Sequence, residues 1–380
     1  MQTSTNVAIL GGGIIGCATA YFLRKRGIEV AVLDTGEIGA EASSAAAGLL
    51  APLGSLSGPG PFADLLLASF HMFPSLVPEL EQATGIDLDY QVNGALRVVR
   101  NAKNMPRLRK RMKGWQPLGL EMHWLSGQEA RSQEPLLAQD ICAAIYAPQE
   151  AQISAPALVR AFARAAASQG AMLYSHSEVI GIQHSNNKAT TLTTANGETL
   201  TCQHLVIAAG AWSARLRDWL GIQLPITPQR GQILALSQPS PPMHTIVFGE
   251  AAYCAPKGDH TIVVGATKEE VGFEKTLTAG GISWLLSTAI RLLPALEALP
   301  IERMWVGLRP KTSDNLPILG PAPGWQNVTI AAGHGSVGVL LSPITGQSIA
   351  DLIATGTTPE LIQPFALNRT SNLAEEDDEC

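Results

Sequence analysis

Apolar residues near the start of the chain alternate between strand-like and helix-like patterns. Residues 6–10 form a short apolar run that predicts a buried strand, and residues 28–33 form a second one. Between them, residues 14–26 carry an apolar helical pattern that ends at Gly27. A strand, a helix and a second strand in this order are typical of a βαβ unit, so the pattern predicts a parallel sheet.

Further elements follow along the chain. Helical patterns cover residues 63–84, 156–167, 282–293 and the segment from Gly338 to about Thr355. Apolar runs predict strands over residues 90–99, 171–182, 204–208, 304–308 and 328–332.

Other segments predict turns and loops. Asn196 and Gly197 form a strong hairpin signal within residues 190–201. Short alternating runs from 229 to 267 predict antiparallel strands. Residues 36–61 are small and flexible, and 309–323 are proline-rich, so both segments predict loops. An irregular segment as long as the first one is more often functional than idle.

Composition describes a folded protein with an acidic end. The chain has 380 residues, of which 46% are hydrophobic and 15% charged, which suits two or three globular domains. Its net charge is 26 − 32 = −6, and residues 375–379 are all acidic. No basic surplus is left for binding nucleic acid or a membrane surface. Residues 368–380 are therefore predicted to be an acidic disordered tail.

Cysteine and histidine positions give no sign of a metal site. The five cysteines lie far apart without a CxxC pair, and the eight histidines show no close pairing. A reducing, cytoplasmic compartment fits this usage. The apolar stretch 7–23 lacks a preceding positive charge, so neither an export signal nor a membrane span is expected.

Three glycines follow the first predicted strand in the order Gly11-x-Gly13-x-x-Gly16. Asp34 ends the next strand at the distance expected for an acid that binds ribose hydroxyls. Gly11 suits a tight turn, Gly13 a close pyrophosphate, and Gly16 close packing of helix on strand. No Arg or Lys directly follows Asp34, so the pattern predicts a dinucleotide without a 2′-phosphate.

Later segments favour a flavin over a nicotinamide dinucleotide. Residues 205–213 run from a strand into small residues, and Gly333-x-Gly335-x-x-Gly338 follows another strand. Strand-plus-glycine segments this far along the chain are typical of flavoproteins whose nucleotide-binding domain is assembled from distant parts of the sequence. The final helix would point its positive N-terminus at the flavin ring, which suits the negative charge of a reduced flavin. A nicotinamide dehydrogenase remains an alternative.

Together these segments resemble the D-amino-acid oxidase-like flavoproteins, and among them the bacterial glycine oxidases of the thiamine pathway. The resemblance covers roughly residues 7–367. Its most specific carriers are the Ser-Ala-Ala-Ala-Gly run that ends at Gly48 and the Gly-Leu-Arg-Pro run that ends at Pro310. Further carriers end at Trp212, Gln232, Thr267, Gly320 and Gly335.

The resemblance implies bound, noncovalent FAD and a set of site residues. It assigns the carboxylate of a small amino-acid substrate to Arg309 and a second contact to Tyr253, and these two are the expected catalytic residues. Ser336 is expected near the substrate, where related enzymes carry a basic residue. An arginine fork can bind a carboxylate through two parallel hydrogen bonds. The implied FAD contacts, with those of the glycine motif, are Gly11, Gly13, Ile14, Ile15, Gly16, Asp34, Thr35, Ser43, Ser44, Ala47, Gly48, Leu49, Val179, Gly210, His334, Gly335, Ser336, Val337, Gly338, Val339 and Leu340.

The implied fold is α/β, with a Rossmann-like FAD-binding domain interleaved with an α+β substrate domain built on an antiparallel sheet. The FAD-binding domain is expected to comprise residues 1–86, 150–226 and 305–367. The substrate domain is expected to comprise residues 87–149 and 227–304. A homo-oligomer is also implied.

The implied activity is oxidation of glycine and other small amines by hydride transfer to FAD, with oxygen as the acceptor. The products would be glyoxylate, ammonia and hydrogen peroxide. Three alternatives stay open within the flavoproteins: a D-amino-acid dehydrogenase, a sarcosine- or proline-type amine oxidase, and an accessory subunit without activity of its own.

Overall fold

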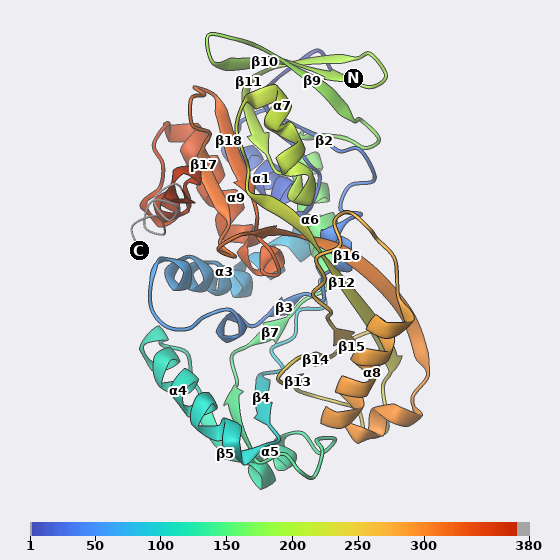
Figure 1. Cartoon of the computed structure of the whole chain (residues 1–380). Coiled ribbons are helices and arrows are strands. Elements are labelled where there is room, and N and C mark those ends of the chain that lie inside the picture. Colours follow the sequence, from blue (N-terminus) through green and yellow to red (C-terminus); the bar gives the residue numbers. More distant parts are fainter. Residues whose placement is uncertain (1, 371–380) are drawn as a thin grey trace.

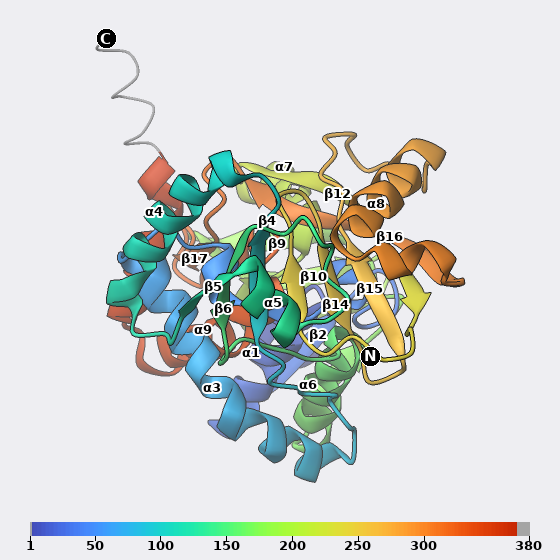
Figure 2. The same ribbon diagram turned by 90° about the horizontal axis from the view of Figure 1, so that it is seen from below.

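Two eight-stranded sheets organise the chain, and each takes its strands from distant parts of the sequence (Figure 1). The computed structural model describes residues 2–370. Helices α3 and α4 lie on one side of the molecule, and α8 with strand β16 lies on the other (Figure 2).

The first sheet has the parallel core that the N-terminal pattern predicts. Strand β1 pairs in parallel with both β2 and β11, and β11 pairs in parallel with β18. Helix α1 packs against α6 and α9 beside this sheet. The strands are β1 (Ser4–Leu10), β2 (Val30–Leu33), β8 (Met172–Tyr174), β9 (Val179–Ser185), β10 (Lys188–Thr194), β11 (Thr199–Ile207), β17 (Ile318–Pro321) and β18 (Val328–Ala332). The helices around it are α1 (Ile14–Lys25), α3 (Pro61–Thr84), α6 (Ala155–Ser168), α7 (Arg217–Leu220) and α9 (Gly338–Thr355).

The second sheet is antiparallel except where β13 pairs with β4. Helix α8 buries Leu285 and Leu292 against its strands. The strands are, in sheet order, β16 (Ile301–Thr312), β12 (Ile226–Ser237), β15 (Thr261–Gly265), β14 (Tyr253–Pro256), β13 (Ile246–Phe248), β4 (Ala95–Val99), β6 (Ala143–Ala147) and β5 (His123–Ser126). The helices are α4 (Met105–Trp115), α5 (Gly127–Gln133) and α8 (Ala279–Leu292). The predicted fold class is confirmed.

Two predicted loops contain regular structure. Residues 309–323 were expected to be a loop, but β16 continues to Thr312 and β17 follows. Strand β16 is the edge of its sheet. An edge strand tolerates Pro310, because one of its sides pairs with no other strand and needs no N–H donor there. The segment 36–61 contains α2 (Ala42–Ala45) and β3 (Leu49–Leu50), and β3 pairs with β7 (Ala151–Gln152).

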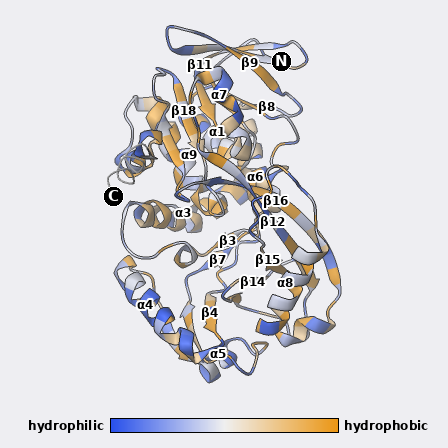
Figure 3. Ribbon diagram, viewed as in Figure 1, coloured by the Kyte–Doolittle hydropathy of each residue, from blue (hydrophilic) through white to orange (hydrophobic). Residues whose placement is uncertain are grey.

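Other predictions differ in extent. The strand expected over 171–182 is two strands, β8 and β9, separated by a turn in which His176 has a φ of 52°. Helix α4 was not predicted, because its mainly hydrophilic sequence carries little apolar pattern (Figure 3).

The predicted domain boundaries stay a prediction, although the strands of the second sheet all fall within residues 95–147 and 226–312. The predicted tail begins at residue 368. Here a 3₁₀ turn covers Leu367–Thr370, and Arg369 pairs with Asp314 at 3.0 Å. The rest of that prediction concerns residues 371–380, which lie outside the described part of the chain. Within residues 2–370, no helix is both long and apolar enough to cross a membrane.

A buried ion pair fixes the second sheet beside the segment after β3. Arg97 of β4 donates two hydrogen bonds to Glu150, at 2.6 and 2.8 Å. Both side chains are at most 5% exposed. Glu150 also accepts the N–H of Leu53, and the Arg97 guanidinium lies 5.5 Å from the ring centre of Trp115. Removing one partner would leave a buried charge without compensation.

We therefore expect Arg97→Met to lower the free energy of unfolding by about 3–5 kcal/mol, as for other broken buried pairs. Arg100→Met is the matched control, because its partner Asp140 is 55% exposed and such surface pairs contribute at most about 1 kcal/mol. Urea denaturation of the cofactor-free proteins measures both values. Equal losses in the two variants would contradict this role of Arg97.

Candidate active site

A cavity of about 560 Å³ opens between the two sheets. The first sheet contributes the turn after β1, the end of β11 and the segment that joins β18 to α9. The second sheet contributes Ile233, Tyr253, Gly265 and Arg309. The segment around α2 and β3 forms a further wall, with Ala45 to Leu49 all lining the cavity.

The first glycine turn has the geometry that its sequence predicts. Gly11 has a φ of 108°, and a Cβ there would lie 2.3 Å from the carbonyl oxygen of Ala208 on the neighbouring strand segment. Asp34 accepts the N–H of Gly12 at 2.7 Å and that of Gly36 at 2.8 Å. Burial raises the pKa of Asp34 above its usual range, although these two bonds oppose the shift. The Asp34 carboxylate, which lies outside the cavity lining, thus holds the glycine turn in place.

The N-terminus of α1 meets a serine at the cavity wall. Ser43 Oγ accepts the N–H of Ile14 at 2.8 Å, and both residues line the cavity. The neighbouring Ser44 does not line it, and its hydroxyl donates to the carbonyl oxygen of Gly39. A helix N-terminus with free N–H groups and a hydroxyl beside it suits a phosphate.

The second glycine segment lines the cavity from His334 to Leu340, where α9 begins. His334 is 3% exposed, and its Nε2 lies 3.2 Å from Thr345 Oγ1. Burial lowers the pKa of His334 to about 3, so the ring stays neutral at physiological pH. The helix N-terminus supplies the positive potential on this side of the cavity.

Arg309 and Tyr253 meet on the second sheet. The Arg309 guanidinium lies against Gly231, where a Cβ would be 2.4 Å from Nη2, and its Nη1 donates to the carbonyl oxygen of Thr267 at 3.0 Å. Burial lowers the pKa of Arg309, and burial raises the pKa of Tyr253 to about 12. Asp314, the first acidic residue after Arg309 in the sequence, pairs with Arg369 instead. Within residues 2–370, Arg309 forms no ion pair, so its cationic fork is open to a ligand.

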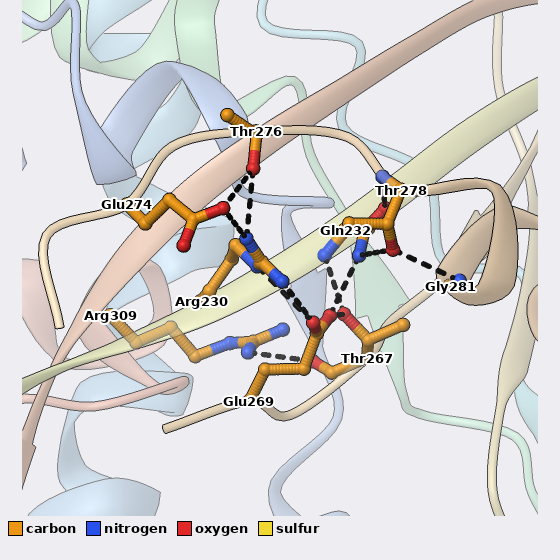
Figure 4. A network of polar contacts seen from close by, with 9 residues as sticks. All are labelled: Arg230, Gln232, Thr267, Glu269, Glu274, Thr276, Thr278, Gly281 and Arg309. Atoms are coloured by element: carbon orange, nitrogen blue, oxygen red, sulfur yellow. Dashed lines mark hydrogen bonds and ion pairs between the residues drawn. The ribbon is translucent and has the colours of Figure 1, made fainter. Parts of the chain in front are cut away.

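A polar network holds the carbonyl group that orients Arg309 (Figure 4). The Thr267 hydroxyl accepts the N–H of Gln232 at 2.8 Å and donates to Glu269. Glu269 also binds the buried Arg230, and the backbones of these two residues exchange two hydrogen bonds. Two motifs that carried the family resemblance, ending at Gln232 and Thr267, therefore form one structural unit beneath Arg309.

The structure brings most of the expected site residues to one cavity. Tyr253, Arg309 and Ser336 all line it. The lining FAD-contact residues are Gly13, Ile14, Ile15, Ser43, Ala47, Gly48, Leu49, Gly210, His334, Gly335, Ser336, Val337, Gly338, Val339 and Leu340. Those outside the lining are Gly11, Gly16, Asp34, Thr35, Ser44 and Val179. All of these cofactor assignments stay predictions.

Several lining residues were not expected from the sequence. Arg97 and Phe248 come from β4 and β13, and Arg111 comes from α4, whose existence the pattern did not indicate. Gly231 and Gly307 lie within motifs that carry the resemblance, so the sequence marked both segments as relevant. Nothing in the sequence placed these two glycines at the cavity wall.

The cavity fits a dinucleotide. Helix N-termini open into it from both the N-terminal and the C-terminal glycine segments, and its wall from Ala45 to Gly48 carries side chains no larger than a methyl group. Backbone N–H groups can therefore approach a bound molecule closely. Cys254, beside Tyr253, is fully buried, and burial raises the pKa of its thiol to about 12. Residues 2–370 contain no cluster of three possible metal ligands.

Comparison with known proteins identifies the family. The profile of the DAO family, described as FAD dependent oxidoreductases, matches residues 6–352. The chain belongs to this family. Its cofactor is accordingly FAD, and the chain is an FAD-dependent oxidoreductase.

Individual relatives agree along nearly the whole chain. A glycine oxidase from Geobacillus kaustophilus is 38% identical over 96% of this chain and 97% of its own length. The crystal structure of a glycine oxidase from that species superposes with a TM-score of 0.93 over 97% of this chain and 99% of that one. A bifunctional protein ThiO/ThiG from Nostoc is 35% identical over 97% of this chain, which spans 56% of that longer protein.

The neighbouring serines test the cofactor assignment. Ser43→Ala removes an oxygen from the cavity wall and leaves the Ile14 N–H without its acceptor, so we expect about tenfold weaker FAD binding, or about 1.4 kcal/mol. Ser44→Ala changes a hydroxyl outside the lining, and its FAD affinity should stay within about twofold of wild type. Flavin fluorescence on titration of the cofactor-free protein gives both values. The reverse order would favour Ser44 as the contact.

Proposed function

We propose that the protein is an FAD-dependent glycine oxidase. The observation that carries the proposal is the Arg309 guanidinium, which faces the cavity beside Tyr253 without a carboxylate partner among the described residues. An open, partly buried arginine fork suits the carboxylate of a small amino acid. The glycine oxidase relatives, which match nearly full length, support the same substrate.

Each residue has a defined part in this reaction. Arg309 would bind the substrate carboxylate, and the Thr267 carbonyl limits how the fork can turn. Tyr253 keeps its proton, because burial raises its pKa to about 12, and it can donate a hydrogen bond to the same carboxylate. Bound FAD would supply the hydride acceptor for the α-carbon, with oxygen as the final electron acceptor. Positioning and electrostatics are then the main contributions of the protein.

The overall reaction balances without another reactant. Glycine, oxygen and water give glyoxylate, ammonia and hydrogen peroxide. No lining residue has to act as a nucleophile, since the neutral amine of the substrate can assist loss of hydride from the adjacent carbon.

We further propose that the product serves thiamine synthesis and that the enzyme works as a cytoplasmic homo-oligomer. The bifunctional ThiO/ThiG relative supports this pathway. It is about twice as long as the region that matches this chain, and its name pairs ThiO with a second function, ThiG. Four cysteines of the described chain are free, which suits a reducing compartment. A dehydrogenase or a sarcosine-type oxidase of the same fold is the alternative.

Anaerobic reduction tests the substrate and the acceptor in turn. We expect yellow flavin bands that bleach when glycine is added without oxygen, followed by hydrogen peroxide when air is admitted. Bleaching by sarcosine or a D-amino acid but not by glycine would identify that compound, rather than glycine, as the substrate. Bleaching by glycine without peroxide, but with rapid transfer to a quinone, would identify a dehydrogenase.

Arg309 variants test the binding role directly. Arg309→Met should raise the KM for glycine about 100-fold, since loss of a charged hydrogen-bonding partner costs about 3 kcal/mol. Arg309→Lys should recover only part of this loss, because it keeps the charge without the fork. Lys311→Met, two residues along β16 and outside the cavity, is the matched control. Steady-state oxygen consumption measures all three, and an unchanged KM in Arg309→Met would refute the role.

A further inference from the structure

One partly buried lysine lies directly behind the cofactor cavity and has no part in the chemistry above. Lys257 extends from the end of β14, and its Nζ donates to the carbonyl oxygen of Ala47 at 2.6 Å and to Gln152 Oε1 at 2.7 Å. Ala47 lines the cavity, whereas Lys257 does not. Both acceptors are neutral oxygens, so no carboxylate of residues 2–370 is in hydrogen-bonding contact with the ammonium.

Such an arrangement lowers the stability of the folded protein, because partial burial removes water from the ammonium group. Burial of an ammonium group disfavours its charged form, and here burial lowers the pKa of Lys257 to about 8. Asp89 and Asp259 act on it from a greater distance and raise the pKa only in part. Asp259 is itself paired with Arg303 at 2.9 Å. The protein thus retains a costly cation at one particular place.

That place is the back of the segment Ala45–Leu49, which we call the cofactor loop. Three of its carbonyl oxygens are held from outside the cavity. Trp305 Nε1 donates to Ala45 at 3.0 Å, Lys257 donates to Ala47, and the N–H of Ile153 donates to Gly48 at 2.9 Å. None of these three donors lines the cavity.

The planar trans peptide then determines where the N–H groups point. In each peptide the N–H lies opposite the carbonyl oxygen, so a carbonyl drawn away from the cavity turns the next N–H toward it. Holding the Ala47 carbonyl therefore directs the Gly48 N–H, and holding the Ala45 carbonyl directs that of Ala46. Within residues 2–370, the Gly48 N–H has no hydrogen-bond acceptor.

We propose that Lys257 is a positioning residue for FAD. Its ammonium holds the Ala47 carbonyl outward, which leaves the Gly48 N–H directed at the cavity where the cofactor binds. Its charge, held behind the loop, also favours the reduced cofactor over the oxidised one, because reduction adds negative charge. The inference depends on FAD binding in this cavity, and not on which amine is the substrate.

Removal of the ammonium tests both effects without turnover. We expect Lys257→Met to bind FAD at least tenfold more weakly, measured by flavin fluorescence. We also expect a tenfold loss of preference for the reduced form, which is a midpoint potential lower by about 30 mV for a two-electron couple. Lys188→Met, at an exposed position of strand β10 in the other sheet, should change neither value. Unchanged affinity and potential in Lys257→Met would overturn the proposal.

A pH series separates positioning from a purely structural role and does not depend on the Met variant. As the wild type passes through pH 8, Lys257 loses its proton, and the FAD affinity should fall. Lys257→Arg stays charged, so its affinity should remain flat from pH 7 to 9 and close to wild type at pH 7. Trp305→Phe removes the indole N–H that donates to the Ala45 carbonyl oxygen and leaves Lys257 in place, so it should weaken FAD binding and keep the pH dependence. A flat wild-type profile would also overturn the proposal.

The lowered pKa of Lys257 also makes the free energy of unfolding depend on pH in a defined direction. Its folded pKa of about 8 lies below the ordinary lysine value of 10.5 that applies to the unfolded chain, so between these values the unfolded state binds more protons. The wild type should therefore gain stability over Lys257→Met as the pH rises from 8 to 10. Urea denaturation of both cofactor-free proteins measures this difference. A constant difference would show that the lysine is not held as described.

Discussion

Close approach of backbone to backbone at the junction of the two sheets is the constraint on which the site depends. The cavity wall is assembled from segments near residues 13, 47, 210, 231, 307 and 335, and they can meet only where side chains are very small. A Cβ on Gly11 would lie within 2.3 Å of a carbonyl oxygen, and one on Gly307 would lie 2.6 Å from the Cβ of Ala45. The small residues thus make the binding surface largely a surface of peptide groups.

This surface leaves charge to a few side chains. On the second sheet, Arg309 faces the cavity without a carboxylate partner among the described residues, and Lys257 lies behind the wall. At the two helix N-termini, the peptide dipoles add positive potential. An anionic cofactor and a substrate carboxylate can each compensate part of this charge. The free protein therefore has an electrostatic imbalance that its ligands relieve.

The sequence predicted the elements whose signals are local. The strands and helix around Gly11 and the hairpin at Asn196 form as expected, because a short stretch of residues determines each one. Pro310 misled the prediction, since its local preference for a loop is overridden by an edge position that only the complete sheet reveals. The bond between Lys257 and Ala47 joins positions 210 residues apart, so no local pattern could indicate it. The resemblance supplied Arg309 and Tyr253, but not the network through Thr267 that orients the arginine.

The interleaved order of strands has a consequence for how the protein acquires its cofactor during synthesis. Strand β11 lies between β1 and β18 in the first sheet, although about 190 residues separate it from β1 in the chain. The cavity wall is complete only when residues 334–340 have been made. A ribosome must therefore release the chain through residue 340 before a finished site can form. Until then, the glycine turn and the cofactor loop exist without the opposite wall, so capture of a cofactor in this cavity has to follow synthesis of residues 334–340.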